Sequence, residues 1–128
     1  MFYNKSIFAL VCAFLLAAIS QVNAAPLLQR RSKSYSGDGT FYTVGLGSCG
    51  KTNKDSDKVV ALSSSLMSSG DLCGKKIKAK GPEGTVTATV VDTCPSCAEG
   101  DVDFSQGAFT EIGTVDAGRV SITWSIQG

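Results

Sequence analysis

Asp92 and Asp103 are the two residues of this 128-residue chain that are best suited to chemistry. Cleavage of a glycosidic bond uses two carboxyl groups on either side of the bond, one as the acid and the other as base or nucleophile. Asp101 is a second choice, but it shares the face of Asp103 in any strand, since side chains two residues apart point the same way. If the fold brings the two carboxyl groups together, they could therefore serve as such a pair.

Both aspartates also have a purely structural interpretation. Asp92 precedes the loop 93–97, and its carboxylate can accept hydrogen bonds from the backbone of that loop. Asp103 can cap the turn that leads to Ser105. From the sequence, both interpretations stay open.

The chain contains no histidine. This excludes a Ser-His-Asp triad, a Cys-His dyad, and zinc or haem bound through histidine. Most hydrolytic mechanisms are therefore excluded, and we expect neither a cofactor nor a metal site.

Four of the five cysteines lie beyond the N-terminal apolar segment: Cys49, Cys73, Cys94 and Cys97. An even number in a short secreted chain is typical of disulfides, and four cysteines allow three pairings. We favour Cys49–Cys73 together with Cys94–Cys97. A zinc site usually shows two C-x-x-C pairs, and a redox site places its C-x-x-C at the start of a helix. The single pair here follows a strand-like run, so both disulfides are interpreted as structural.

Residues 1–24 have the layout of a secretory signal peptide. Lys5 supplies the positive charge, 7–19 is an apolar run, and the small or branched residues at 22–24 suit a cleavage site. The run is shorter than the ~20 apolar residues that a membrane-spanning helix needs. We therefore expect an extracellular protein, either free or associated with a cell wall, and no membrane partner.

Residues 25–31 form a short propeptide that ends in Arg30-Arg31, which resembles a kexin-type processing site in a fungal secretory protein. The alternative is a solvated pair of charges in a flexible leader. Cleavage there would leave 97 residues from Ser32, with nine basic and eleven acidic side chains. The lysines at 75–80 alternate with apolar residues, which is typical of the solvated face of a strand. With a net charge of −2, nucleic acid is not an expected partner.

Short alternating runs separated by glycines predict one small, mostly β domain at 39–128, preceded by a flexible arm at 32–38. The expected elements are strands at 40–44, 75–80, 86–90 and 120–126, a short helix within 59–67, and one or two helical turns at 105–112. The turn at 81–84 should join two strands in a hairpin. Ser105 should cap the last helix.

The aromatic residues divide between core and surface. Alternation along the last strand places Trp124 in the core, and Phe104 and Phe109 are expected there as well. Tyr42 is then the best aromatic residue for stacking on a sugar, while Tyr35 falls in the arm.

A series of short motifs runs in one order through nearly the whole domain. They are Gly39-Thr40-Phe41-Tyr42, Gly47-Ser48-Cys49-Gly50, Val60-Ala61-Leu62-Ser63, Cys73-Gly74-Lys75, Val90-Val91-Asp92-Thr93-Cys94-Pro95-Ser96-Cys97, Val102-Asp103-Phe104-Ser105-Gln106-Gly107-Ala108-Phe109, Gly118-Arg119-Val120 and Trp124. The series resembles the double-psi β-barrel of expansin-like, barwin-like and rare-lipoprotein-A-like secreted proteins, especially the short single-domain fungal forms. The resemblance implies a six-stranded double-psi β-barrel with one or two short helices.

The resemblance also implies a shallow acidic groove lined by Thr40, Tyr42, Asp92 and Asp103. In hydrolytic relatives similar to family 45 endoglucanases, two carboxylates act as acid and base. Expansins lack the second carboxylate and loosen polysaccharide contacts without cleaving bonds. We expect a monomeric, non-catalytic protein that binds cell-wall polysaccharide in this groove.

Two alternatives are kept beside this expectation. The first is an extracellular protein-binding module such as a cysteine-protease inhibitor. It would present the loop 45–50 and the Cys94–Cys97 staple as a rigid edge, because rigid loops lose less entropy on binding. The second is a weak glycoside-cleaving enzyme of the endoglucanase or lytic transglycosylase type, which requires the carboxylate pair.

Overall fold

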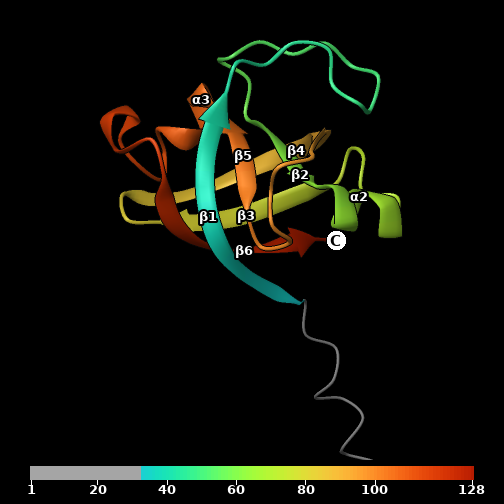
Figure 1. Cartoon of the computed structure of the whole chain (residues 1–128). Coiled ribbons are helices and arrows are strands. Elements are labelled where there is room, and N and C mark those ends of the chain that lie inside the picture. Colours follow the sequence, from blue (N-terminus) through green and yellow to red (C-terminus); the bar gives the residue numbers. More distant parts are fainter. Residues whose placement is uncertain (1–32) are drawn as a thin grey trace, which may run out of the picture. The chain divides into compact units, whose positions relative to one another are not determined.

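A computed structural model describes residues 33–128, so the predicted signal peptide and propeptide lie outside the described residues. The described chain forms a closed barrel with the strand order β1–β5–β2–β4–β3–β6 (Figure 1). The strands are β1 (Ser34–Tyr42), β2 (Val59–Ser63), β3 (Lys76–Gly81), β4 (Gly84–Cys94), β5 (Val102–Ser105) and β6 (Val120–Gln127). The helices are α2 (Ser64–Ser69), α3 (Gln106–Phe109) and the 3-10 helix η2 (Val115–Ala117). The predicted six-stranded barrel with short helices is confirmed.

Alternation of polar and apolar residues builds the wall of the barrel. β3 exposes its lysines, while Ile77 and Ala79 are fully buried on the inner side. This is the period of two that a strand with one solvated face must show. The core also contains the three aromatic residues predicted there, namely Phe104, Phe109 and Trp124. Across residues 33–128, no helix is long and apolar enough to cross a membrane.

The expected flexible arm at 32–38 is wrong, because β1 begins at Ser34 and pairs with β6 in antiparallel fashion from that residue on. Tyr35 stacks on Trp124, with 4.4 Å between the ring centroids. Stacking of this kind adds to the free energy gained by burying the aromatic surface. The ordered domain therefore starts five residues earlier than the motif series suggests, and Tyr35 belongs to the barrel.

The helix expected within 59–67 is wrong in its first half, which forms strand β2. All five residues of β2 are buried, those that point out of the barrel as well as those that point into it. A short apolar run that is buried on both faces has no alternation of polar and apolar residues, so its sequence does not distinguish a strand from a helix. The helix starts only after Ser63, whose side chain accepts a hydrogen bond from the backbone N–H of Leu66.

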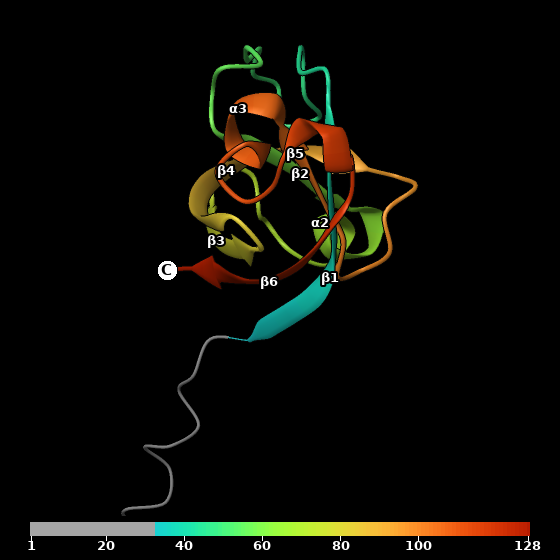
Figure 2. The same ribbon diagram turned by 90° about the vertical axis from the view of Figure 1, so that its left-hand side faces the viewer.

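The predicted hairpin and helix cap are confirmed, whereas the strand predicted at 40–44 ends at Tyr42. β3 and β4 form the predicted hairpin, in which Gly81 pairs with Gly84. Ser105 caps α3 by accepting a hydrogen bond from the backbone N–H of Ala108. α3 lies at one end of the barrel in both views (Figure 2), where Phe109 packs at 5.0 Å from the ring of Phe41. This contact closes that end of the core.

Both predicted disulfides are present, Cys49–Cys73 and Cys94–Cys97. The first connects the loop 43–58, which joins β1 to β2, with the segment that precedes β3. In Figure 1 the loop 43–58 passes over one end of the barrel. Its two arms are held together by a β-bridge between Leu46 and Thr52. The second disulfide holds the turn that follows β4.

Candidate functional site

Three of the predicted site residues lie in one row across four neighbouring strands. Thr40 of β1 pairs with Asp103 of β5, and Asp103 pairs with Ala61 of β2. Ala61 pairs on its other side with Asp92 of β4. Directly paired residues share a face of the sheet. The two aspartates therefore lie on the same side of the wall, with one small residue between them.

This side is the outer face of the barrel. Val60 and Leu62 belong to the core, so Ala61 between them points outward. Ala61 is nevertheless only 2% exposed. Polar side chains of the surrounding strands must therefore cover it.

A β-bulge brings Asp92 to this face. Val86, Ala88 and Val90 point into the core, and a strict alternation would send Asp92 inward as well. The register between β2 and β4 shifts after Val60, so that Val90 and Val91 together occupy the place of one residue. A bulge of this kind reverses the alternation beyond it. The shift turns the carboxylate of Asp92 outward.

Hydrogen bonds join the four predicted groove residues in pairs. The hydroxyl of Thr40 donates to Oδ1 of Asp103 over 3.0 Å. The hydroxyl of Tyr42 donates to Oδ2 of Asp92 over 3.4 Å. Tyr42 lies on β1, so its side chain reaches past β5 and β2 to meet β4. The structure thus brings all four residues together.

The carboxylate of Asp92 also anchors backbone. Its Oδ1 accepts hydrogen bonds from the backbone N–H of Thr93 at 2.8 Å and of Ser48 at 2.9 Å. The structural interpretation of Asp92 is therefore confirmed, and the functional one stays a prediction. For Asp103 it does not hold, because the cap of α3 is Ser105 and the partner of Asp103 is Thr40.

The loop 43–58 reaches Asp92 through a glycine. A Cβ on Gly47 would lie 2.2 Å from the carbonyl oxygen of Val91. The backbone N–H of Cys49 donates to that same oxygen over 3.2 Å. Only glycine allows the loop to approach the bulge this closely. The loop therefore forms one wall of the site.

Burial and neighbouring charge change the titration of two site residues. The pKa of the Tyr42 hydroxyl is raised, chiefly by burial and further by the carboxylates of Asp92 and Asp103. Burial also raises the pKa of Asp103, with a smaller contribution from Asp92. The hydrogen bond from Thr40 and the charge of Arg119 act in the opposite direction. Tyr42 therefore stays protonated and available as a donor.

Some residues at the site were missed or misjudged from the sequence. The hydroxyls of Ser48 and Thr93 lie 2.8 Å apart at the edge of the site. Ser48 could have been recognised from the sequence by its position between Gly47 and the disulfide-bonded Cys49. Asp101 has a structural role, because its carboxylate accepts hydrogen bonds from the backbone N–H groups of Asp38 and Ala98. It takes no part in the acidic row.

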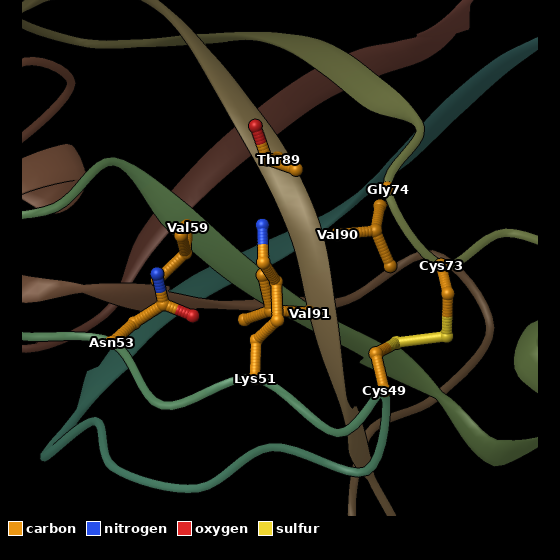
Figure 3. A pocket seen from close by; sticks show the side chains of 9 residues that line it. All are labelled: Cys49, Lys51, Asn53, Val59, Cys73, Gly74, Thr89, Val90 and Val91. Carbon is orange, nitrogen blue, oxygen red and sulfur yellow. A yellow bond between two sulfur atoms is a disulfide. The ribbon is translucent and has the colours of Figure 1, made fainter.

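A pocket of about 370 Å³ lies next to this site, under the same loop (Figure 3). The Cys49–Cys73 disulfide forms one side, and the side chain of Lys51 crosses the space toward Thr89. At the edge of this pocket, the carboxylate of Asp57 accepts hydrogen bonds from the backbone N–H of Lys54 and from the side-chain N–H of Asn53. These two bonds lower the pKa of Asp57, the first more than the second. Within residues 33–128, no group of three His, Cys, Asp or Glu side chains is arranged to hold a metal ion.

Comparison with known proteins places this geometry in a family, although no family model matches the chain. It is 42% identical over 79 residues to the allergen Asp f 7 of Aspergillus fumigatus, covering 60% of this chain and 29% of the allergen. A crystal structure of a mutant Clavibacter michiganensis expansin in complex with cellohexaose superposes with a TM-score of 0.70 at 29% identity, covering 75% and 51% of the two chains. The Streptomyces papain inhibitor superposes with a TM-score of 0.68 at 30% identity, covering 75% of this chain and 96% of the inhibitor. The chain belongs to the expansin-like double-psi β-barrel family.

The resemblance inferred from the motif series is thereby confirmed. This expansin-like barrel spans about half the length of the Clavibacter expansin and less than a third of the Aspergillus allergen. It covers the papain inhibitor almost completely. The similar structures thus include an expansin in complex with cellohexaose and a papain inhibitor.

Proposed function

We propose that this chain is a secreted, non-catalytic protein that binds neutral cell-wall polysaccharide across the outer face of β1, β5, β2 and β4. The observation that carries the proposal is the row formed by Thr40, Asp103, Ala61 and Asp92, with Tyr42 bonded to its far end. A structural neighbour, the Clavibacter expansin, was solved with cellohexaose. This supports a β-linked glucan as the ligand class.

The chemistry of the row suits a chain of sugars. Carboxylates and hydroxyls accept and donate hydrogen bonds to sugar hydroxyls, while an aromatic ring offers a surface for stacking. Asp92 and Asp103 are two strands apart, so their Cα atoms are about 10 Å apart at a strand spacing of ~4.8 Å. That span is of the size of two sugar units, so each carboxylate would contact a different unit.

The same contacts argue for binding rather than cleavage. Both oxygens of Asp92 already accept hydrogen bonds, Oδ1 from two backbone N–H groups and Oδ2 from Tyr42. Three donors thus hold the Asp92 carboxylate in one orientation, and each of its oxygens already has a hydrogen-bond partner. Asp92 therefore positions the loop and the ligand.

Retention on insoluble cellulose, β-1,3-glucan and chitin tests the proposal. Asp92→Asn and Tyr42→Ala should each weaken retention about tenfold, the loss typical of a central contact. Asp116→Asn removes an exposed carboxylate elsewhere and should leave retention unchanged. Equal retention of all variants would contradict the groove. Release of reducing sugar that is abolished by Asp103→Asn would contradict the non-catalytic part.

A second candidate function, inhibition of a cysteine protease, is favoured by one specific feature. Leu46, in the loop 43–58, is 73% exposed. The loop is fixed by the bridge to Thr52 and by the disulfide from Cys49. An apolar side chain on a preorganised loop is suited to fill a pocket of a protein partner.

Inhibition of papain tests this second candidate. Leu46→Ala should weaken inhibition about tenfold, as expected for an interface anchor. Val115→Ala is the matched control, because Val115 is the other exposed large apolar residue in the described chain. Absence of inhibition by the unmodified protein, or equal inhibition by both variants, would exclude this candidate.

A further inference from the structure

The outer face of β3 lies on the opposite side of the barrel from Asp103. In the closed strand order, two strands separate β3 from β5 in either direction around the ring. β5 carries Asp103, whereas β3 carries Lys76, Lys78 and Lys80 on its exposed side. β4 carries Asp92 and is a neighbour of β3, but β3 pairs only with the residues of β4 from Gly84 to Thr89, so Asp92 lies beyond the paired segment.

Hydroxyl side chains surround the lysines on both sides. Lys78 pairs with Thr87 of β4 and with Ser125 of β6. Lys80 pairs with Thr85 and Thr123 in the same way. Because paired residues share a face, each lysine has a hydroxyl on either side of it. Successive lysines are about 7 Å apart along the strand, at ~3.4 Å per residue.

Two adjoining hollows follow this basic face. The first, of about 350 Å³, is lined by Ser34, Lys78, Ala79, Lys80, Thr85, Thr123, Trp124 and Ser125. The second, of about 320 Å³, is lined by Lys80, Gly81, Ser121, Ile122 and Thr123. They share Lys80 and Thr123, so they form a continuous depression along β3 and β6. No carboxylate lines either hollow.

The lysine charges are not neutralised by the rest of the described chain. The ion pairs within residues 33–128 are Lys58–Glu111 and Arg119–Asp38, and neither involves β3. The acid that comes nearest along the chain is Glu83, in the turn between β3 and β4, and it takes part in neither of these ion pairs. Asp38 pairs with Ser121 of β6, and its carboxylate is bonded to Arg119 over 2.9 Å. Two of the β3 lysines thus face the depression as free cations.

We propose that this depression binds an acidic polysaccharide, with Lys78 and Lys80 holding carboxylate groups of successive uronic acid units. The hydroxyls of Thr85, Thr123 and Ser125 would bond the sugar hydroxyls between them. The site is separate from the acidic row and does not depend on the function proposed for it. A protein with both sites would hold a neutral and an acidic wall polymer at the same time.

The face fits an acidic sugar better than a nucleic acid. Trp124, the aromatic residue in the lining, is 2% exposed and offers no ring for a base to stack on. Hydroxyl groups that alternate with single cations instead match a polymer with one carboxylate and several hydroxyls per unit.

Binding of the purified protein to polygalacturonate tests the proposal, with fully methyl-esterified polygalacturonate as the neutral ligand of the same backbone. The double variant Lys78→Gln/Lys80→Gln should lower the affinity for polygalacturonate about tenfold, as expected for two surface charge contacts. The double variant Lys51→Gln/Lys54→Gln makes the same change in net charge on the loop 43–58. It should change the affinity less than about twofold, since its charges lie away from the ligand. Binding of the methyl ester should be weak for all three proteins.

Three outcomes would overturn the proposal. Equal loss in both double variants would show that net charge alone attracts the polymer. Equal binding of the methyl ester would show that the carboxylates are not recognised. Competition by a DNA duplex at the same salt concentration and with equal affinity would show a general polyanion site. The variant Asp92→Asn should keep its affinity for polygalacturonate, so failure of the neutral-glucan proposal and failure of this one are separable.

Discussion

Asp92 and Asp103 occupy one cross-strand row, each paired with Ala61 from an opposite side of β2. They are 11 positions apart in the chain, on strands that do not pair with each other. Their mutual repulsion is visible in the pKa of Asp103, which Asp92 raises in addition to the larger effect of burial. The pKa of Asp103 therefore depends chiefly on its burial and to a smaller extent on the neighbouring carboxylate.

The free energy of unfolding should depend on pH because the pKa of Asp103 is raised in the folded state. A carboxyl whose pKa is raised in the folded state binds more protons there than when unfolded, so its contribution to stability falls as the pH rises above the ordinary value of 3.8. Asp103→Asn removes this loss and keeps an oxygen to accept the bond from Thr40. The melting temperature of the variant, relative to the unmodified protein, should be higher at pH 7 than at pH 3.

Thermal unfolding at several pH values measures this difference. Asp116→Asn is the control, because it makes the same change in net charge at an exposed residue. If the two variants showed the same pH trend, burial of Asp103 would not be the cause.

The contact between the loop 43–58 and the bulge should be sensitive to a single methyl group. Gly47→Ala would place a Cβ 2.2 Å from the carbonyl oxygen of Val91, a clash with backbone that only a shift of the loop relieves. We expect a loss of about 1–3 kcal/mol in the free energy of unfolding, the usual cost of overpacking. Gly45→Ala is the matched control, since a Cβ there meets nothing within 4 Å. Urea unfolding distinguishes the two, and equal stability would contradict the close approach.

The two disulfides should contribute unequally. Cys49–Cys73 spans 24 residues and Cys94–Cys97 spans 3. If a disulfide acts by lowering the entropy of the unfolded chain, Cys49–Cys73 should stabilise the fold by about 3.5 kcal/mol and Cys94–Cys97 by about 2 kcal/mol. Replacement of each pair by serines, followed by chemical unfolding, should reproduce this order. The reverse order would mean that the short staple stabilises the native state directly.

The stacking of Tyr35 on Trp124 should protect the backbone amides of the first residues of β1 from hydrogen exchange. Tyr35→Ala removes the ring that lies 4.4 Å from Trp124 and should cost about 1–3 kcal/mol of stability. Hydrogen exchange at the amides of 34–38 should speed up more than at β4. Ser36→Ala changes an exposed residue on the same strand and should leave exchange unchanged. Fast exchange of 34–38 in the unmodified protein would favour the flexible arm instead.

The local features of the fold were largely predictable from the sequence. The alternation in β3 and β6, the hairpin turn at 81–84 and the cap at Ser105 depend on neighbours a few residues away, so pattern and turn chemistry were sufficient. The even number of cysteines and their spacing predicted both disulfides. The order of the motifs predicted the barrel and named the four groove residues.

What the sequence could not decide depends on contacts between distant segments. β2 was interpreted as the start of a helix because a strand that is buried on both faces shows no alternation of polar and apolar residues. Its two neighbours in the barrel, β4 and β5, both come later in the chain. The arm at 32–38 became a strand because Trp124, about 90 positions later, stacks on Tyr35. The outward turn of Asp92 depends on a bulge that exists only in the pairing of β4 with β2. Residue types thus determined which groups are available, whereas the closure of the barrel decided which of them meet, since pairing partners are set by the packing of the whole chain.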